Sequence, residues 1–419
     1  MGGSMIRGRV VRVPAAGPRH LIGRIRVMLV GHLGAALCWI VALLGFGPPE
    51  AEAQDWALNS SLSQRFVYDD NIFLTPTDEI STFGSLTTPR LTLTRNSPTS
   101  KVTFDSQFPY QAYFGHSDLN SFDQVVNLSG SKALSERSTI QLGANLDHRT
   151  NVRSEFDDTD TFVPRKFRRT AWGATPSWTY LLSPTDTVNL AASYQDVSYN
   201  TTDRVDYRTY GSVLGYSHQL SEVAQLTGQL SYTRFEPDVV TDRRTNVFGG
   251  TVGYRYTPSE RFVMSGSAGL SYDITTEDGR PDDSGFGFLF NFDFKYQVSE
   301  QMRANLTLVH DTEPSGDGRQ TARSRASVSL DYELTELTTL GLDARYTDNE
   351  DYLGGLSSNS GNARFVSLNP SINWDVTEDL RLGAEYEFRH KTDGNGDANS
   401  NAVFLTLRYA LPDLQWGGL

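Results

Sequence analysis

From residue 54 onward, apolar and polar side chains alternate along most of the chain. The clearest run is 286–296, where every even position is aromatic and the odd positions include Gly287, Asn291, Asp293 and Lys295. Successive side chains of a β-strand point to opposite faces, so this run has one apolar face and one polar face. The segments 226–232, 340–346 and 380–389 repeat the pattern, and no comparable helical periodicity is found. The pattern predicts an all-β protein.

Short turns recur along these strands, and most begin with Ser or Thr followed by Glu or Pro. Neighbouring turns of this kind are 36 to 48 residues apart, and each interval holds two alternating runs of about ten residues and one longer polar segment. This arrangement is typical of a meander of antiparallel hairpins with tight turns at one end and longer loops at the other. With a further turn at 96–99, eight tight turns predict 18 strands, with 16 as the next choice. The seven turns begin at Ser135, Ser183, Ser221, Ser259, Ser299, Thr335 and Thr377.

The two-faced strands favour a transmembrane, antiparallel, up-and-down β-barrel. A β-propeller has a similar period but needs four short strands in each repeat. A soluble sandwich would divide so long a meander into several domains. A membrane barrel accounts for the strand length, the even strand number and the alternation between lipid and water. Residues 54–419 are therefore predicted to form one barrel.

The first 53 residues differ from this body. An Arg-rich stretch leads into the apolar run 27–44, and a Gly/Pro segment then leads to Ala51 and Ala53. A basic region, an apolar region and a small-x-small site form a secretory signal peptide. We expect cleavage after Ala53, so that the mature chain begins at Gln54. The alternative is a retained membrane helix, because the apolar run is nearly long enough to span a bilayer.

Charge and composition narrow the function classes. Residues 54–419 hold 31 Lys and Arg against 48 Asp and Glu, which makes nucleic acid an unsuitable partner. The chain has one cysteine, Cys38, in the leader, so the mature chain is expected to contain no disulfide. Neither a phosphate-binding loop nor a Cys/His metal motif is present, and no cofactor or metal site is expected. Asp147-His148 and His310-Asp311 could suggest a hydrolase, but adjacent strand residues face opposite sides and cannot act together.

Two sets of residues are candidates for function. Tyr and Trp favour the membrane interface, and an aromatic residue stands three positions before five of the tight turns. These residues are predicted to form a periplasmic girdle: Tyr180, Tyr256, Tyr296, Tyr332 and Trp374. The predicted lumen is rich in amides and hydroxyls in the first half of the barrel and in charges of both signs in the second. The charged pore-lining candidates are Asp293, Lys295, Arg323, Arg325, Asp331, Asp343, Arg345, Glu385 and Arg389.

The strand 65–73, with its Asp-Asp-Asn-Ile sequence, and the repeated Tyr-x-x-Ser/Thr-Glu turns resemble the β-barrel porin 2 group of bacterial outer-membrane proteins. The resemblance implies a barrel in the outer membrane, often linked to exopolysaccharide secretion. Its implied partners are outer-membrane lipid and lipopolysaccharide, the barrel assembly machinery and polysaccharide export components. The chain departs from the usual porin pattern because the last alternating run, 402–411, is followed by Pro412 and seven further residues instead of ending on an aromatic residue.

Three functions remain open at this point. The first is a non-enzymatic, porin-like channel or conduit associated with exopolysaccharide export. The second is a structural or adhesive barrel that is plugged by its own loops, and the third is a barrel hydrolase. The sequence leaves the transported solute, the oligomeric state and the binding of divalent ions by the acidic loops undetermined.

Overall fold

The computed structural model describes residues 55–152, 165–239, 241–352, 363–394 and 396–417. These residues form β segments and one 3₁₀ helix, η1 (Ser117–Leu119). The β segments in chain order are β1 (Asp55–Asp69), β2 (Thr82–Asn96), β3 (Ser100–Gln107), β4 (Tyr110–Phe114), β5 (Ser121–Phe122), β6 (Gln124–Ser135), β7 (Ser138–Asn151), β8 (Phe167–Leu181), β9 (Asp186–Tyr199), β10 (Tyr207–Ser221), β11 (Ala224–Pro237), β12 (Arg243–Ser259), β13 (Phe262–Glu277), β14 (Asp283–Gln297), β15 (Met302–Pro314), β16 (Gln320–Thr335), β17 (Thr338–Tyr352), β18 (Ala363–Asp375), β19 (Leu380–Asp393) and β20 (Gly396–Gly417).

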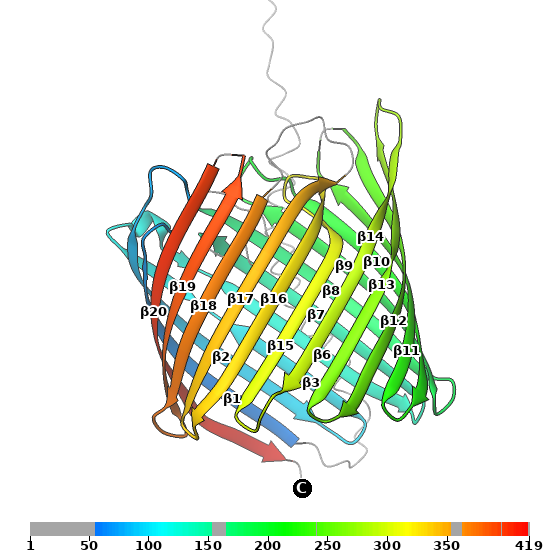
Figure 1. Ribbon diagram of the computed structural model, residues 1–419, viewed down its shortest axis with the longest axis horizontal. Coiled ribbons are helices and arrows are strands. Elements are labelled where there is room, and N and C mark those ends of the chain that lie inside the picture. Colours follow the sequence, from blue (N-terminus) through cyan, green and yellow to red (C-terminus); the bar gives the residue numbers. More distant parts are fainter. Residues whose placement is uncertain (1–54, 153–164, 240, 353–362, 395, 418–419) are drawn as a thin grey trace, which may run out of the picture. The chain divides into compact units, whose positions relative to one another are not determined.

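The β segments form one closed antiparallel barrel of 18 strands (Figure 1). The barrel closes where β1 pairs with β20, from Asp55 opposite Gly417 to Asp69 opposite Ala402. β4 continues β3 along β2, and β5 continues the line of β6, so each of these pairs counts as one strand. The break between β3 and β4 contains Pro109, which has no N–H to donate to the neighbouring strand. The predicted fold class and strand number are confirmed.

The Ser and Thr residues that mark the tight turns have a structural task. The hydroxyl oxygen of the first turn residue accepts a hydrogen bond from the backbone N–H two residues later. Such hydroxyls stabilise a turn locally and end the strand before it. The regular turn spacing in the sequence therefore reports the hairpin connections directly. The bonds run from Arg137 N to Ser135, Thr185 N to Ser183, Val223 N to Ser221, Gln301 N to Ser299, Leu337 N to Thr335 and Asp379 N to Thr377, at 3.1–3.4 Å.

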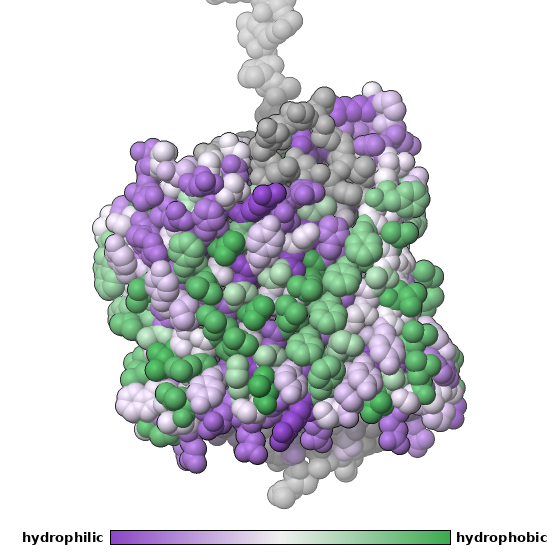
Figure 2. Space-filling model, viewed as in Figure 1, coloured by the Kyte–Doolittle hydropathy of each residue, from purple (hydrophilic) through white to green (hydrophobic). Residues whose placement is uncertain are grey.

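Side chains alternate between the two faces of the barrel wall. On β14, Phe286 and Phe288 point outward and are 74% and 50% exposed. Asp293 points inward, where it accepts a hydrogen bond from Thr307 Oγ1 at 3.0 Å. Figure 2 shows the outward apolar side chains as a band at mid-height, with polar surfaces above and below it. An apolar surface of this extent is stable against lipid and unfavourable in water. In the described parts of the chain, no helix is long and apolar enough to cross a membrane.

The strands are longer than the sequence pattern indicates. Most run for 13–17 residues, so they continue beyond the apolar band. The segment 391–401, one of the longer polar segments between alternating runs, is not an open loop but a hairpin in which β19 and β20 pair as far as Asp393 opposite Gly396. The expected end of the last strand near Leu411 is also wrong. β20 continues past Pro412 and pairs Trp416 with Trp56. A β-bulge at Pro412 allows this, because the bulged residue does not have to donate a backbone N–H to β1.

Several predictions fall on other parts of the chain. Ala51, Ala53 and Gln54, together with the segments 153–164 and 353–362, lie outside the described residues. The chain divides into a segment of residues 1–52 and a compact unit of residues 53–419. Cleavage of the leader therefore stays a prediction.

Candidate functional site

The barrel encloses a cavity of about 620 Å³. Its lining comes mainly from β1, β2, β4 and the last six strands, β15–β20, so it lies against one side of the wall. Charged and hydroxyl side chains predominate among the residues that face it. Among them are Arg65, Thr307, Ser327, Asp343, Arg345, Asn369, Glu385, Glu387 and Arg389.

Charges of opposite sign are paired across the strands of this cavity. Arg65 Nη2 lies 2.7 Å from Glu385 Oε2, and both side chains are about one third exposed. The guanidinium carbon of Arg65 also lies 3.7 Å from the centroid of the Phe404 ring. A half-exposed ion pair adds little stability. Its main effect here is to fix the position of the Arg65 charge at the cavity wall, because the aromatic face holds the guanidinium plane.

The loop 70–81, which connects β1 to β2, packs against side chains that also line the cavity. Ile72 and Phe73 pack with Tyr113 of β4 and Phe404 of β20 in a buried cluster. Leu74 is fully buried against Phe365 of β18 and Ala398 of β20. Three consecutive apolar residues would not be buried in a loop that extends into water. The Ile-Phe-Leu sequence therefore holds this segment against strands on both sides of its own hairpin.

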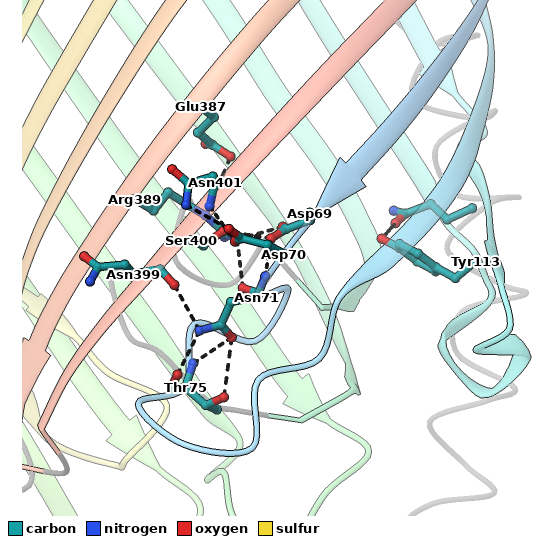
Figure 3. A network of polar contacts seen from close by, with 11 residues as sticks. Asp69, Asp70, Asn71, Thr75, Tyr113, Glu387, Arg389, Asn399, Ser400 and Asn401 are labelled. Atoms are coloured by element: carbon teal, nitrogen blue, oxygen red, sulfur yellow. Dashed lines mark hydrogen bonds and ion pairs between the residues drawn. The ribbon is translucent and has the colours of Figure 1, made fainter.

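A network of buried polar groups anchors the base of this loop (Figure 3). Arg389 Nη2 of β19 lies 2.8 Å from Asp69 Oδ2, and both side chains are buried. Ser400 Oγ of β20 donates to Asp69 Oδ1 at 2.8 Å, and the Asn71 backbone N–H donates to the same oxygen at 3.0 Å. A buried ion pair of this kind depends on such extra hydrogen bonds to offset its desolvation. We call Asp69, Asn71, Arg389 and Ser400 the Asp69 anchor.

Asn71 shapes the loop from within (Figure 3). Its Nδ2 donates to the backbone oxygens of Thr75 at 2.8 Å and Asn399 at 3.0 Å. Its Oδ1 accepts from the Thr75 backbone N–H at 3.1 Å. Asp70 accepts from the backbone N–H of Asn401 at 2.6 Å. The Asp-Asp-Asn-Ile sequence thus has a physical role, which is to turn the chain into the barrel and fix it to β20.

A further segment packs beside the loop. Leu119 of η1 lies in the same buried cluster as Ile72 and Phe73. Lys166 Nζ, just before β8, donates to the backbone oxygens of Asp118 at 2.5 Å and Asn120 at 2.6 Å. The ammonium group therefore holds the C-terminal end of η1, where backbone carbonyls are left without helical partners.

The charged residues predicted to line the pore fall into two groups. Four of them, Asp343, Arg345, Glu385 and Arg389, face the cavity together. Arg323 is buried at the outer end of β16, where its Nη2 lies 2.5 Å from Glu313 Oε2. The lining of the cavity does not include Asp293, Lys295, Arg323, Arg325 or Asp331. Sequence reasoning missed Arg65 and the loop 70–81, because it treats residues 65–73 as one strand, whereas β1 ends at Asp69.

The five aromatic residues of the predicted girdle lie near the tight-turn ends of their strands and on the outward face. Tyr296, Tyr332 and Trp374 are 39%, 40% and 47% exposed. The Tyr296 and Tyr256 rings each contact Phe262, with ring centroids 6.2 and 6.3 Å apart. This position suits an interface residue, and the role in a girdle stays a prediction.

Histidines near the outer strand ends contact hydroxyl or amide groups. Nδ1 lies 2.7 Å from Thr170 Oγ1 in His148 and 2.8 Å from Ser324 Oγ in His310. Nδ1 of His390 lies 2.8 Å from Asn399 Oδ1. Over the described ranges, His, Cys, Asp and Glu form no group of three or more that could hold a metal ion. In the 393–399 segment, Asp393 pairs with Lys391 at 2.9 Å.

Comparison with known proteins gives two findings. The family model described as "Protein of unknown function, DUF481" matches residues 183–366, which is less than half of the chain. This is a different family from the β-barrel porin 2 group that the sequence resembles. The search of curated protein sequences gives no match.

Solved structures with a similar fold are outer-membrane proteins. The outer membrane protein opdK from Pseudomonas aeruginosa is 13% identical over 86% of this chain and 99% of that chain, with a TM-score of 0.45. A BenF-like porin from Pseudomonas fluorescens Pf-5 is 10% identical over 85% and 99%, with a TM-score of 0.46. The FrpB iron transporter from Neisseria meningitidis is 9% identical over 84% and 81%, with a TM-score of 0.48. At this distance the likeness is one of barrel architecture.

Proposed function

We propose that this protein is a channel in the bacterial outer membrane that conducts small hydrated polar solutes and performs no catalysis. The observation that carries the proposal is the cavity of about 620 Å³, lined by charges of both signs, inside a closed barrel with an apolar outer band. Lipid can cover that outside, and closure leaves no strand edge exposed around most of the wall. A lumen of paired charges and hydroxyls offers hydrogen-bond partners to a solute that leaves bulk water.

The chemistry of the lining favours hydroxylated solutes or small zwitterions over large ions of one sign. Arg65 and Arg345 face the same cavity as Asp343 and Glu385, so neither sign dominates. The serine and asparagine side chains beside them can both donate and accept hydrogen bonds, as sugars do.

A planar-bilayer recording on the refolded mature chain tests the proposal. Stepwise conductance that is weakly selective between cations and anions is the expected result. A refolded, heat-modifiable barrel that gives no steps at any voltage would exclude an open channel. It would favour the second candidate, a barrel plugged by its own loops.

The plugged barrel has a specific observation in its favour, which is the packing of the loop 70–81 against Tyr113, Phe365 and Phe404 of the cavity lining. Deleting residues 72–78 separates the candidates. If the loop only narrows the channel, conductance exists before the deletion and increases after it. If the loop closes the channel, conductance appears only in the deletion variant.

The association with exopolysaccharide export is the finer form of the proposal. Its support is the resemblance of residues 65–73 and of the tight turns to a group linked to that process, together with the hydroxyl-rich lining. Lipid, lipopolysaccharide, the barrel assembly machinery and polysaccharide export components would then be its partners. Loss of secreted polysaccharide in a deletion strain, restored by the intact gene, is the expected outcome, and unchanged secretion would limit the protein to small solutes.

A further inference from the structure

The pairing between β14 and β15 is shorter than the pairing of the adjoining strands, and we call the line between these two strands the seam. β14 and β15 pair only from Phe290 opposite His310 to Gln297 opposite Arg303. The adjoining pairs are longer, since β13 pairs with β14 up to Asp283 and β15 pairs with β16 up to Pro314. Residues 283–289 and 311–314 therefore belong to strands that are paired on one side only. Figure 1 shows the upper ends of β14 and β15 diverging.

The unpaired part of the seam lies at the height of the outer half of the membrane. A strand rises about 3.3 Å per residue and tilts by about 40° in such barrels, which gives about 2.5 Å of height per residue. Pairing thus ends about 15 Å above Tyr296, whereas an apolar band is about 25 Å tall. The outward side chains of β14 stay apolar to the top of that distance, because Phe288 and Phe286 follow Phe290.

A contact between two loops explains why β15 leaves β14. The loop 315–319 after β15 reaches the loop 200–206 after β9, on the far side of four intervening strands. The Val205 backbone N–H donates to Gly316 O at 2.8 Å, and Arg204 forms an ion pair with Asp317. A side chain at position 316 would lie 2.8 Å from Tyr199 Oη, so glycine allows this approach. The contact draws the β15–β16 hairpin over the lumen.

The two sides of the seam differ in chemistry. The unpaired part of β14 presents Phe286 and Phe288 to lipid, and its lumen-facing positions are Asp283, Gly285, Gly287 and Leu289. On the β15 side, His310 hydrogen-bonds Ser324, and Asp311 and Glu313 face the lumen near Arg323. An apolar edge therefore stands opposite a polar edge, and the lumen face between Asp283 and Leu289 carries only the two glycines.

From this geometry we infer that the barrel has a lateral opening between β14 and β15, through which an acyl-chain amphiphile passes between the lumen and the outer leaflet. Its chain lies against the phenylalanines, and its polar head lies at the His310 edge and the charged groups behind it. The inference rests on the proposed membrane-embedded channel. Unpaired backbone groups are unfavourable in lipid unless the site meets water or a polar ligand, which the opening supplies.

Fluorescence quenching in vesicles tests the opening, since Cys38 is the chain's only cysteine and precedes the barrel. Single cysteines replace Phe288 on the lipid face, Leu289 on the lumen face behind the unpaired seam, and Asn291 on the lumen face behind paired strands. Each carries a small fluorophore, and the probe is lysophosphatidylcholine with a nitroxide near the top of its acyl chain. We expect the labels at 288 and 289 to be quenched and the label at 291 to keep its fluorescence.

Equal fluorescence at 289 and 291 would overturn the inference. Iodide, a water-soluble quencher, should reach both lumen positions, which shows that the labels are accessible. Stepwise conductance in a protein without quenching at 289 would leave the channel intact and remove only the opening. Absence of conductance together with quenching at 289 would instead reject the channel.

Disulfide formation provides a second measurement. The pair Gly287→Cys/Glu313→Cys continues the register of the seam, and Asn291→Cys/Val309→Cys lies in its paired part. Both pairs face the lumen. They also occupy the same type of site in an antiparallel ladder, in which hydrogen-bonded and non-hydrogen-bonded pairs alternate. Oxidation should join 291 to 309 and leave 287 and 313 reduced, because cysteines with Cα atoms more than about 7 Å apart cannot be bridged. Rapid formation of a disulfide between 287 and 313 would show that β14 and β15 are paired there. A disulfide between two copies of residue 287 would show that a second chain covers the unpaired edge of β14.

Discussion

Two parts of the barrel wall have the same outside and different insides. β8–β13 and β15–β20 both present leucine, tyrosine and valine to lipid. Inside, β8–β13 carry hydroxyl and amide groups that bond to each other, such as Thr245 Oγ1 and Thr275 Oγ1 at 2.9 Å and Asn189 Nδ2 donating to Thr179 Oγ1 at 3.1 Å. The lumen-facing positions of β15–β20 carry the charges and most of the cavity. Lipid restricts one face of every strand, and the other face is free to differ.

The proposed channel therefore depends most on the lumen face of the second part and on the loop 70–81 that packs beside it.

Removing the cation of the Asp69 anchor should have the largest effect. In Arg389→Gln, the buried Asp69 carboxylate loses this cation, and breaking such a pair costs about 3–5 kcal/mol. We expect the loop 70–81 to leave its position while the barrel persists. Protease added to the folded protein should then cut within 70–81, and conductance should increase.

The matching double variant Asp69→Asn/Arg389→Gln serves as the control, because it removes both charges together. It should be cut more slowly than Arg389→Gln. Equal resistance of the loop in wild type and Arg389→Gln would show that the apolar contacts of Ile72, Phe73 and Leu74 suffice to hold it.

The lipid and lumen faces of one strand give the second contrast. Phe290→Arg places a charge on the lipid face of β14, where it costs about 2–4 kcal/mol near the midplane. Lys295→Glu changes a charge on the lumen face of the same strand, where water screens it. Heat-modifiable gel mobility should show impaired assembly or a lower melting temperature in Phe290→Arg only. Equal loss of folded barrel in both variants would contradict the assignment of the two faces.

Charge reversal in the cavity gives the third contrast. Arg345→Glu replaces a positive group at the cavity by a negative one, whereas Gln229→Glu adds a single negative charge to the lumen face of β11, away from the cavity lining. Two charges 4 Å apart interact by about 1 kcal/mol in water. We therefore expect cation preference to rise about fivefold in Arg345→Glu and less in Gln229→Glu.

The reversal potential in a salt gradient measures this preference. At about 1 M salt the Debye length is about 3 Å, so the difference between the two variants should shrink. A larger shift in Gln229→Glu than in Arg345→Glu would mean that ions pass mainly along the β8–β13 wall.

The sequence predicts the features that repeat in every hairpin. The Ser/Thr turns and the alternation with period two set the strand number, the closure and the outward face, because each strand must satisfy the same lipid. The loop 70–81 could not be predicted, since its position depends on Phe365, Ala398 and Arg389, more than 290 residues away in the sequence. The separation of β14 from β15 could not be predicted either. β14 has the strongest alternation in the chain, and the contact between loops 200–206 and 315–319 overrides its pairing.

The smallest effect is expected at an ion pair outside the membrane. Arg381 at the start of β19 lies against Asp375 at the end of β18, with Nε 2.5 Å from Oδ1 and Nη2 2.9 Å from Oδ2. Both side chains are exposed, in contrast to Arg389 on the same strand. Exposed pairs contribute about 0–1 kcal/mol, and this one lies beside a turn that the Thr377 hydroxyl already holds. Arg381→Gln should therefore leave the loop 70–81 resistant to protease and the melting temperature nearly unchanged. A loss as large as that of Arg389→Gln would mean that burial does not distinguish the two arginines, and the Asp69 anchor would then have no special role in holding the loop.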